Sequence, residues 1–395
     1  MFLTSFVHRE DLFNIAQRWF CGRPAPDDAM LLTEILICDG FVIGETLEVL
    51  ATNLLKEVYQ EPFRQQPIQF KGELRDSLTR CAAGRSPRVE ELFRLYGENP
   101  DFYYREAPIN GVMCLDDRSR ILGLFRIKRP KRIAEKANRK IANWIFRNVQ
   151  HKAQEMAEAR ASKYGVLVEQ LITPKEEMVQ EFVKAEEAIA RNFREGSIQF
   201  ERDGLAIHDV GAIKIVADEE RLIHLENLLD DDPAIRVVEK ETFRGHYQAT
   251  NLILEVAWDE EYISRRYHEG RGWGRYLSRG IPPERLKKGL PLLRDGAEPK
   301  INIELILSTF PDMVESELGA SIHEERIIAQ RDNKIYKGYI PTNVEFLLEY
   351  LFAVGFSPRA HIDEIPIKLW GRYLPETLSS YVRQLHNFPE YDILY

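Results

Sequence analysis

The sequence lacks long apolar runs, paired cysteines and a basic surplus, and each absence excludes a class of protein. No apolar run approaches the roughly 18 residues needed to span a bilayer, so we expect no membrane span. The four cysteines form no Cys-x-x-Cys pair and no signal peptide is recognisable, which predicts reduced thiols in a cytoplasmic protein. A net charge of −9 argues against a general nucleic-acid coat protein, since such proteins carry a basic surplus.

Length and apolar spacing predict more than one domain, the first of them helical. A chain of 395 residues is long for one domain, and its apolar share of 44% is ordinary for a globular protein. Apolar residues recur at helical spacing in several stretches of the first 110 residues. These stretches are Asp11–Phe20, Ala29–Cys38, Ile43–Val58 and Val89–Tyr96.

A long helix-forming region follows in the middle of the chain. It runs from Lys136 to Arg194 and is interrupted near Gly165 and again at Thr173-Pro174, where Thr173 can cap the next helix. This pattern predicts a helical hairpin inserted over residues 137–200. A solvated, charged hairpin and a partner-binding arm both fit it.

Two carboxylates interrupt or precede apolar, strand-like runs. Glu304 lies inside the run Ile303–Leu307, and a buried strand that carries one carboxylate needs a metal or a base to offset the charge. Asp209 precedes the run that ends at Val216, with Lys214 five residues after it. Glu304 and Asp209 are therefore expected to face each other on neighbouring strands.

Cations and one aromatic residue surround these runs. The stretch Arg126–Lys136 is densely basic, and Pro130 stands at a helix-opening position. Cations at a helix N-terminus are unfavourable for the helix dipole but suited to a polyphosphate. Between the two carboxylates, Gly245 permits a tight turn and Tyr247 precedes a β-rich run. An exposed aromatic residue beside cations suits a nucleobase.

These blocks, in this order, resemble the RelA/SpoT family of guanosine tetra- and pentaphosphate (alarmone) synthetases. The resemblance covers roughly residues 116–330. Its residues are Arg126-x-Lys128 with Lys136, Asp209 with Lys214, Gly245-x-Tyr247, and Glu304 followed by Glu317-Leu318-Gly319 and His323.

The sequence also departs from the family pattern. Lys214 and Ser308 stand where the family has Arg, and Arg and Lys are not interchangeable where a bidentate or stacked contact is needed. Ile306 replaces Gln, Arg132 replaces Ser, and Asn251 replaces His. These changes bear on nucleotide affinity and substrate identity more than on the carboxylates.

The resemblance implies an α+β fold, a mixed β-sheet with flanking helices of the nucleotidyltransferase-like kind. We expect an all-helical domain at 1–115, a synthetase domain at 116–330 and a C-terminal extension at 331–395. The synthetase domain would include the hairpin and a basic loop at 265–300, where cations alternate with Trp273 and Tyr276. Such a loop fits a ligand-binding surface and an unoccupied surface loop about equally well.

The resemblance further implies transfer of the β,γ-pyrophosphate of ATP to the 3′-hydroxyl of GDP or GTP. Asp209 and Glu304 would be the catalytic residues and would hold Mg²⁺. Arg126, Lys128 and Lys136 would bind the ATP phosphates. Lys214 and Lys240 would assist with charge, and Tyr247 would stack on the acceptor base. Glu317 is expected to orient its neighbours, and His323 and His208 to be structural.

Bifunctional members of the family carry a metal-dependent hydrolase domain at their N-terminal end. No histidine occurs between Arg9 and Gln150, so we expect no hydrolase activity from residues 1–115, which fit a degenerate remnant of that domain or an unrelated helical domain. Two alternatives stay open for the synthetase region. The acceptor could be another nucleotide or a tRNA 3′ end bound through residues 265–300, or the chain could be a catalytically degenerate nucleotide-binding protein that regulates a partner through residues 137–200.

Overall fold

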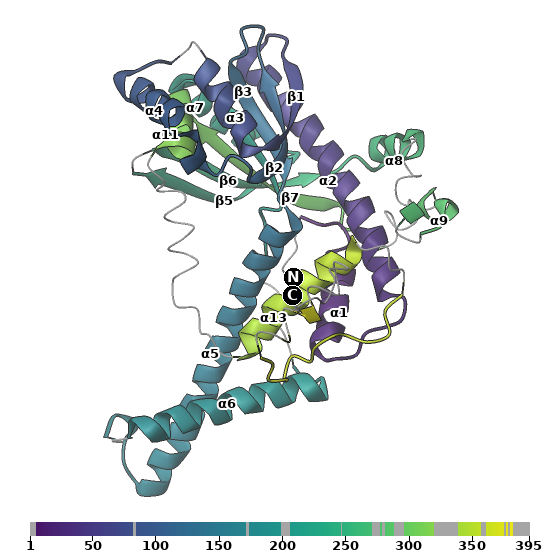
Figure 1. The fold of residues 1–395 in the computed structure, drawn as a ribbon, viewed down its shortest axis with the longest axis vertical. Helices are drawn as coiled ribbons and strands as arrows, with labels where there is room; N and C mark the ends of the chain where they lie inside the picture. The colour runs from purple at the N-terminus through teal and green to yellow at the C-terminus, as the bar shows by residue number, and fades with distance from the viewer. Residues whose placement is uncertain are drawn as a thin grey trace, which may run out of the picture.

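The structure, a computed structural model, describes most of the chain but not all of it. The described residues are 5–81, 84–170, 174–198, 206–245, 247–270, 277–278, 281–287, 296–319, 339–356, 361–374, 377 and 380–381. The fold is α+β, as expected, and is built on one seven-stranded mixed sheet (Figure 1). None of the helices in these ranges is long and apolar enough to cross a membrane.

The sheet has the strand order β1-β2-β3-β4-β7-β6-β5. All neighbouring strands are antiparallel except β4 and β7, which run parallel at the centre. The strands are β1 (Arg64–Phe70), β2 (Pro108–Leu115), β3 (Ile121–Ile127), β4 (Gly211–Val216), β5 (Ile235–Arg244), β6 (Gln248–Ala257) and β7 (Lys300–Ser308).

Helices cover both faces of this sheet. One face packs into the larger core with α1 (Arg9–Phe20), α2 (Asp28–Tyr59), α5 (Pro130–Tyr164), α7 (Glu219–Asp231) and α13 (Tyr339–Gly355). The other face packs at one end into a smaller core with α3 (Lys71–Arg80), α4 (Pro87–Glu98) and α11 (Phe310–Leu318). The remaining helical segments are η1 (Pro100–Tyr103), η2 (Val168–Gln170), α6 (Lys175–Glu195), α8 (Glu260–Glu269) and α9 (Pro283–Lys287).

The expectation of an all-helical region at 1–115 is wrong. Strands β1 and β2 belong to this region and pair with each other at one edge of the sheet. Helix α2 lies directly on β3: a Cβ atom at Gly123 would come within 2.8 Å of the Lys214 carbonyl oxygen and 3.3 Å of Leu55. Glycine at position 123 is therefore required mainly by the neighbouring β4 backbone, and it also leaves room for Leu55 of α2. The N-terminal region supplies part of the sheet and of its cover.

The predicted helical insertion is present between β3 and β4. Helix α5 begins at Pro130 and ends at Tyr164, where Gly165 adopts a positive φ of 67°. After η2, helix α6 packs against α5 and crosses it at the end of α5 that lies far from the sheet (Figure 1). Helix α13, from the predicted C-terminal extension, packs against α5 and α2 and contributes Leu347 and Leu351 to the larger core. The C-terminal region is therefore part of the main fold.

Candidate functional site

The site is built on the face of the sheet that lies opposite the larger core. Along β7, Ile303, Leu305 and Leu307 are buried in that core, so the intervening Glu304 points to the other face. In the ladder, Glu304 pairs with Ala212 of β4, and Ala212 pairs with Arg126 of β3. The alternation of strand side chains thus places Arg126 and Glu304 on one face, two strands apart.

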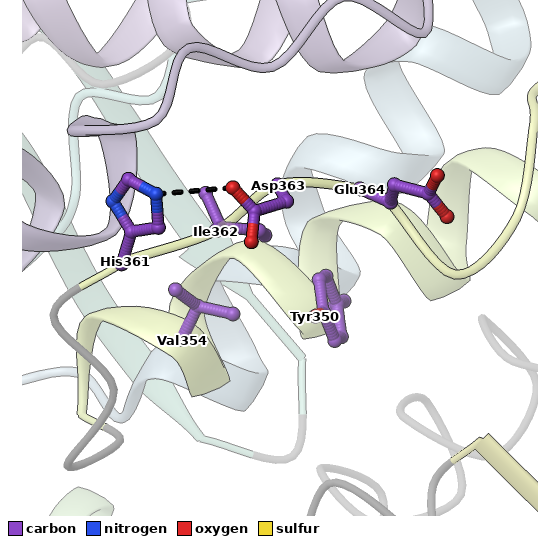
Figure 2. A pocket seen from close by; sticks show the side chains of 6 residues that line it. All are labelled: Tyr350, Val354, His361, Ile362, Asp363 and Glu364. Atoms are coloured by element: carbon purple, nitrogen blue, oxygen red, sulfur yellow. Dashed lines mark ion pairs between the residues drawn. The ribbon is translucent and has the colours of Figure 1, made fainter.

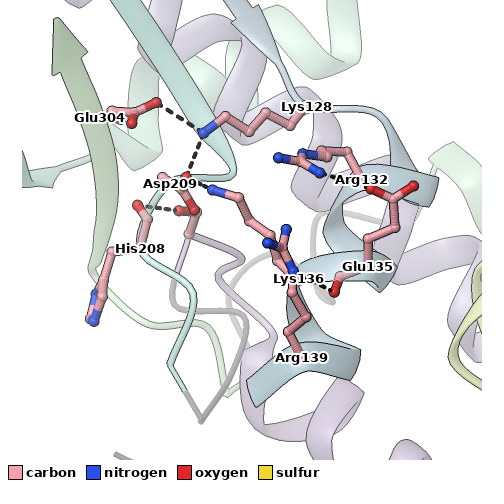
Figure 3. Close-up of polar contacts among 9 residues, drawn as sticks. Lys128, Arg132, Glu135, Lys136, Arg139, His208, Asp209 and Glu304 are labelled. Carbon is pink, nitrogen blue, oxygen red and sulfur yellow. Dashed lines mark hydrogen bonds and ion pairs between the residues drawn. The ribbon is translucent and has the colours of Figure 1, made fainter. Parts of the chain in front are cut away.

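Asp209 reaches this face from the segment that leads into β4. Lys128, directly after β3, is fixed beside it because its backbone N–H donates to the carbonyl of Val210 at 2.8 Å. The Lys128 Nζ donates to Asp209 Oδ2 at 2.5 Å and to Glu304 Oε2 at 2.9 Å (Figure 3). Lys136, from the second turn of α5, donates to the same Asp209 oxygen. One ammonium group therefore bridges the two carboxylates.

Burial and charge perturb this cluster strongly. The side chains of Asp209, Glu304 and Lys128 are 16%, 15% and 12% exposed. Burial alone would raise the pKa of Asp209, but the ammonium groups of Lys128 and Lys136 outweigh it and hold that pKa well below its usual range. For Lys136, burial and the neighbouring Lys128 prevail over the attraction of Asp209 and lower the pKa to about 8. Perturbation of this kind is typical of functional sites.

Arg126 and Lys214 are two further cations on this face. Lys214 pairs with Leu124 of β3, so it lies diagonally across from Arg126 in the ladder. Burial lowers the pKa of both side chains, against the attraction of Glu317 and Glu304. Within the described part of the chain, neither side chain forms an ion pair or a hydrogen bond. Two half-buried cations without a direct partner are suited to an anion.

The donor set fits a hard divalent cation. Asp209 and Glu304 both present an oxygen to one positively charged group, which is the arrangement that a cation between them requires. No cluster of three or more His, Cys, Asp or Glu side chains suited to a metal occurs among the described residues. Mg²⁺ is commonly held by one or two carboxylates together with substrate phosphates and water, so two protein oxygens are sufficient.

Helices α3 and α11 pack on the same face of the sheet as the site. Glu317 of α11 lies 4.0 Å from Nε of Arg75, an α3 side chain that is only 3% exposed. Lys71 of α3 is close enough to Lys214 to lower its pKa further. Arg75 and Lys71 are not predicted as site residues by the sequence. A single cation in an amphipathic helix does not indicate which part of the protein the helix will pack against.

Two predicted nucleotide-binding residues lie away from the carboxylates. Lys240 pairs in the ladder with Leu252, which belongs to the larger core, and its Nζ lies 2.6 Å from Glu226 of α7. It therefore projects from the opposite face and is not brought together with the carboxylates. Tyr247 is half-buried in the turn between β5 and β6, and the next residue, Gln248, donates its N–H to Asp312 of α11 at 2.7 Å.

The remaining predicted histidines divide into two cases. The ring Nδ1 of His208 lies 2.7 Å from the side-chain amide nitrogen of Asn302, and the Ser5 hydroxyl donates to the backbone carbonyl of His208. These contacts fit a structural role for His208. His323 lies outside the described residues, as do parts of the basic loop, including Trp273 and Tyr276.

A pocket of about 350 Å³ lies between α13 and residues 361–364 (Figure 2). An ion pair between His361 and Asp363, 3.0 Å long, stands at its rim, and both side chains are mostly exposed. None of the predicted site residues lines this pocket.

Comparison with models of known protein families finds no match, and a search of the curated proteins finds none either. The motifs and the geometry around Asp209 and Glu304 are therefore the basis on which a function is proposed.

Proposed function

We propose that this chain is a divergent RelA/SpoT-type synthetase with a nucleotidyltransferase-like domain, which transfers the β,γ-pyrophosphate of ATP to the 3′-hydroxyl of GDP or GTP. The observation that carries the proposal is the meeting of Asp209 and Glu304 at one cation, beside two half-buried cations without a direct partner. Three of the four sequence blocks form this arrangement, and all four occur in the order of the family motifs.

Arg126, Lys128, Lys136 and Lys214 bind the triphosphate of ATP. Their charges converge on one face of the sheet, and partial burial strengthens each contact with a phosphate oxygen. Arg126 offers a planar fork for two oxygens, whereas each lysine offers a single charge. Because several independent contacts fix the phosphates, the β-phosphorus is held in line with the acceptor oxygen.

Asp209 and Glu304 hold a divalent cation together with the nucleotide. When bound, Mg²⁺ neutralises charge that develops on the phosphate oxygens during transfer. Asp209 suits this role because its pKa lies well below the usual range, so the carboxylate is fully ionised at neutral pH.

Glu304 orients the acceptor hydroxyl and takes its proton. The 3′-oxygen forms a bond to the β-phosphorus of ATP, the bond between that phosphorus and the α,β-bridging oxygen breaks, and AMP leaves. The proton passes from the hydroxyl to the Glu304 carboxylate. Glu304 lies in β7 between the buried residues Ile303 and Leu305, which hold the carboxylate in the fixed position that this step needs.

Residues around Glu304 bear on the identity of the acceptor. Ile306 and Asn251 pair across β7 and β6 on the Glu304 face, and both are half-buried. They replace Gln and His of the family pattern, so the contact surface for the acceptor differs from that of the family. This difference keeps a different nucleotide, or a tRNA 3′ end, as the alternative acceptor.

The test incubates the purified full-length chain with γ-³²P-labelled ATP and Mg²⁺ and a panel of acceptors: GDP, GTP, the other nucleoside diphosphates and tRNA. We expect AMP release that depends on the acceptor, with label appearing on GDP or GTP. Asp209→Asn and Glu304→Gln should lose this transfer. Lys300→Met, which removes an exposed cation at the start of β7 that pairs with Glu255 at 3.1 Å, should keep it. Label on tRNA alone would shift the proposal to that acceptor, and ATP hydrolysis to ADP would refute it.

A further inference from the structure

Lys128 occupies the position between the two carboxylates that a cation would take. Its Nζ lies 2.5 Å from Asp209 Oδ2 and 2.9 Å from Glu304 Oε2, and the side chain is only 12% exposed. The backbone N–H of Lys128, directly after β3, donates to the carbonyl of Val210. This hydrogen bond positions the side chain so that its ammonium group lies between Asp209 and Glu304 (Figure 3). The contact is therefore part of the fold.

This occupancy excludes simultaneous binding of a metal ion to both oxygens. A Mg²⁺ ion lies about 2.1 Å from each ligand oxygen, so it would need the space that the Nζ fills. The charges already balance as well, since Lys128 and Lys136 face Asp209 and Glu304. A divalent ion added to this cluster would meet two ammonium groups at short range, which is strongly unfavourable.

We propose that Lys128 is a resident counter-cation of the empty site and exchanges with the divalent ion. The metal displaces the ammonium group from Asp209 and Glu304, and the released side chain moves to the phosphates that arrive with the metal. Metal ion and nucleotide thus bind cooperatively, and the free protein has low affinity for the metal alone. This exchange rests on the proposed function for the identity of the nucleotide, but the competition itself requires only the two carboxylates.

The test measures Mn²⁺ binding to the full-length chain without nucleotide, by electron paramagnetic resonance of free Mn²⁺. Lys128→Met should bind Mn²⁺ at least about tenfold more tightly than the wild type. The reason is that removing a unit charge a few ångströms from a divalent ion changes affinity by more than a decade, even at an effective dielectric constant of about 20. Lys128→Gln should behave in the same way.

Lys131→Met is the matched control. Lys131 lies in the first turn of α5, is 68% exposed and faces Glu349 at 4.0 Å, so it carries the same charge without touching the site. Its removal should leave Mn²⁺ affinity within about twofold, because an exposed charge is screened by water and salt. Unchanged or weaker Mn²⁺ binding by both Lys128 variants would overturn the exchange, as would the absence of Mn²⁺ binding in all of the proteins.

The cooperative part has a second readout. With an ATP analogue that carries a methylene group between the α- and β-phosphates, wild-type affinity for Mn²⁺ should rise strongly, and in Lys128→Met the rise should be smaller by about tenfold. An equal rise in both proteins would overturn the coupling. Neither binding experiment requires pyrophosphate transfer. If the exchange is observed but the protein has no transferase activity, only the proposed function is refuted. If transfer is observed without the exchange, only this inference is refuted.

Discussion

Asp209→Asn tests whether the two lysines and the two carboxylates act as one charge cluster. The substitution keeps the shape of the side chain but removes the charge that the Nζ atoms of Lys128 and Lys136 share at one oxygen. Within the described ranges, Glu304 then remains as the only carboxylate that accepts a hydrogen bond from Lys128. Breaking a buried ion pair costs about 3–5 kcal/mol, and an exposed pair contributes about 0–1 kcal/mol. At 16% exposure, Asp209 lies closer to the buried limit, so we expect a loss of roughly 2–4 kcal/mol.

Urea denaturation at pH 7 measures this loss in the free energy of unfolding. Because the folded pKa of Asp209 is lowered, its contribution is complete above the unfolded pKa of about 3.9 and is lost as the pH falls through the folded value. The difference between wild type and Asp209→Asn should therefore stay constant between about pH 5 and 7 and shrink below about pH 4. Combining Asp209→Asn with Lys136→Met should cost less than the two single losses added together.

A ligand measurement separates a functional cluster from a merely structural one. With one carboxylate removed, the two ammonium groups are freer to bind an anion, so pyrophosphate without metal should bind to Asp209→Asn about tenfold more tightly than to the wild type. Mn²⁺ should bind at least about tenfold more weakly. A variant as stable as the wild type, with unchanged pyrophosphate affinity, would refute the reasoning.

Three further substitutions test individual roles. Glu304→Gln keeps a hydrogen-bond acceptor for the Lys128 ammonium group but removes the negative charge, so turnover should fall by about 10²–10⁴ while equilibrium dialysis still detects ATP binding. Wild-type turnover would exclude Glu304 as a base. Tyr247→Ala should raise the KM of the acceptor by roughly tenfold to a hundredfold with little change for ATP, because stacking contributes about 1–3 kcal/mol per base; an equal effect on both substrates would contradict that role. Lys240→Met should leave kcat/KM within about twofold, since it faces Glu226 on the other side of the sheet, and a large loss would contradict this placement.

Much of the helical structure could be predicted from apolar spacing and from helix-end residues. Pro130 opens α5, Gly165 ends it, and the two predicted helices at Ala29–Cys38 and Ile43–Val58 are parts of the single helix α2. The strands that carry the carboxylates were also recognisable, because β4 and β7 are central and nearly continuous apolar runs.

The edge strands could not be recognised in the same way. Strand β1 reads Arg-Gln-Gln-Pro-Ile-Gln-Phe and has one buried residue, and β5 alternates charges with no fully buried residue. Edge strands need little apolar surface and often carry charge, so their patterns resemble loops. Without a signal for β1 and β2, the apolar spacing of residues 1–115 predicts a separate helical domain, whereas α2 packs on the sheet.

Register explains what was and was not found at the site. The sequence predicts that Asp209 and Glu304 lie together, because Asp209 precedes one buried apolar run and Glu304 interrupts another. In the structure these two runs, β4 and β7, pair in parallel. It gives no information on which face of β5 carries Lys240, since a shift of one residue inverts every side chain of a strand. The approach of α3 and α11, which brings Arg75 to Glu317, depends on packing between segments more than 200 residues apart and has no local signal.

The most direct test of the central claim is a crystal structure of the chain with Mg²⁺ and the methylene analogue of ATP. We expect one Mg²⁺ within about 2.1 Å of an oxygen of both Asp209 and Glu304, with Lys128 moved from the carboxylates to the phosphates and Arg126 and Lys214 beside the phosphates. A nucleotide bound elsewhere, or a metal that touches neither carboxylate while Lys128 still bridges them, would contradict it.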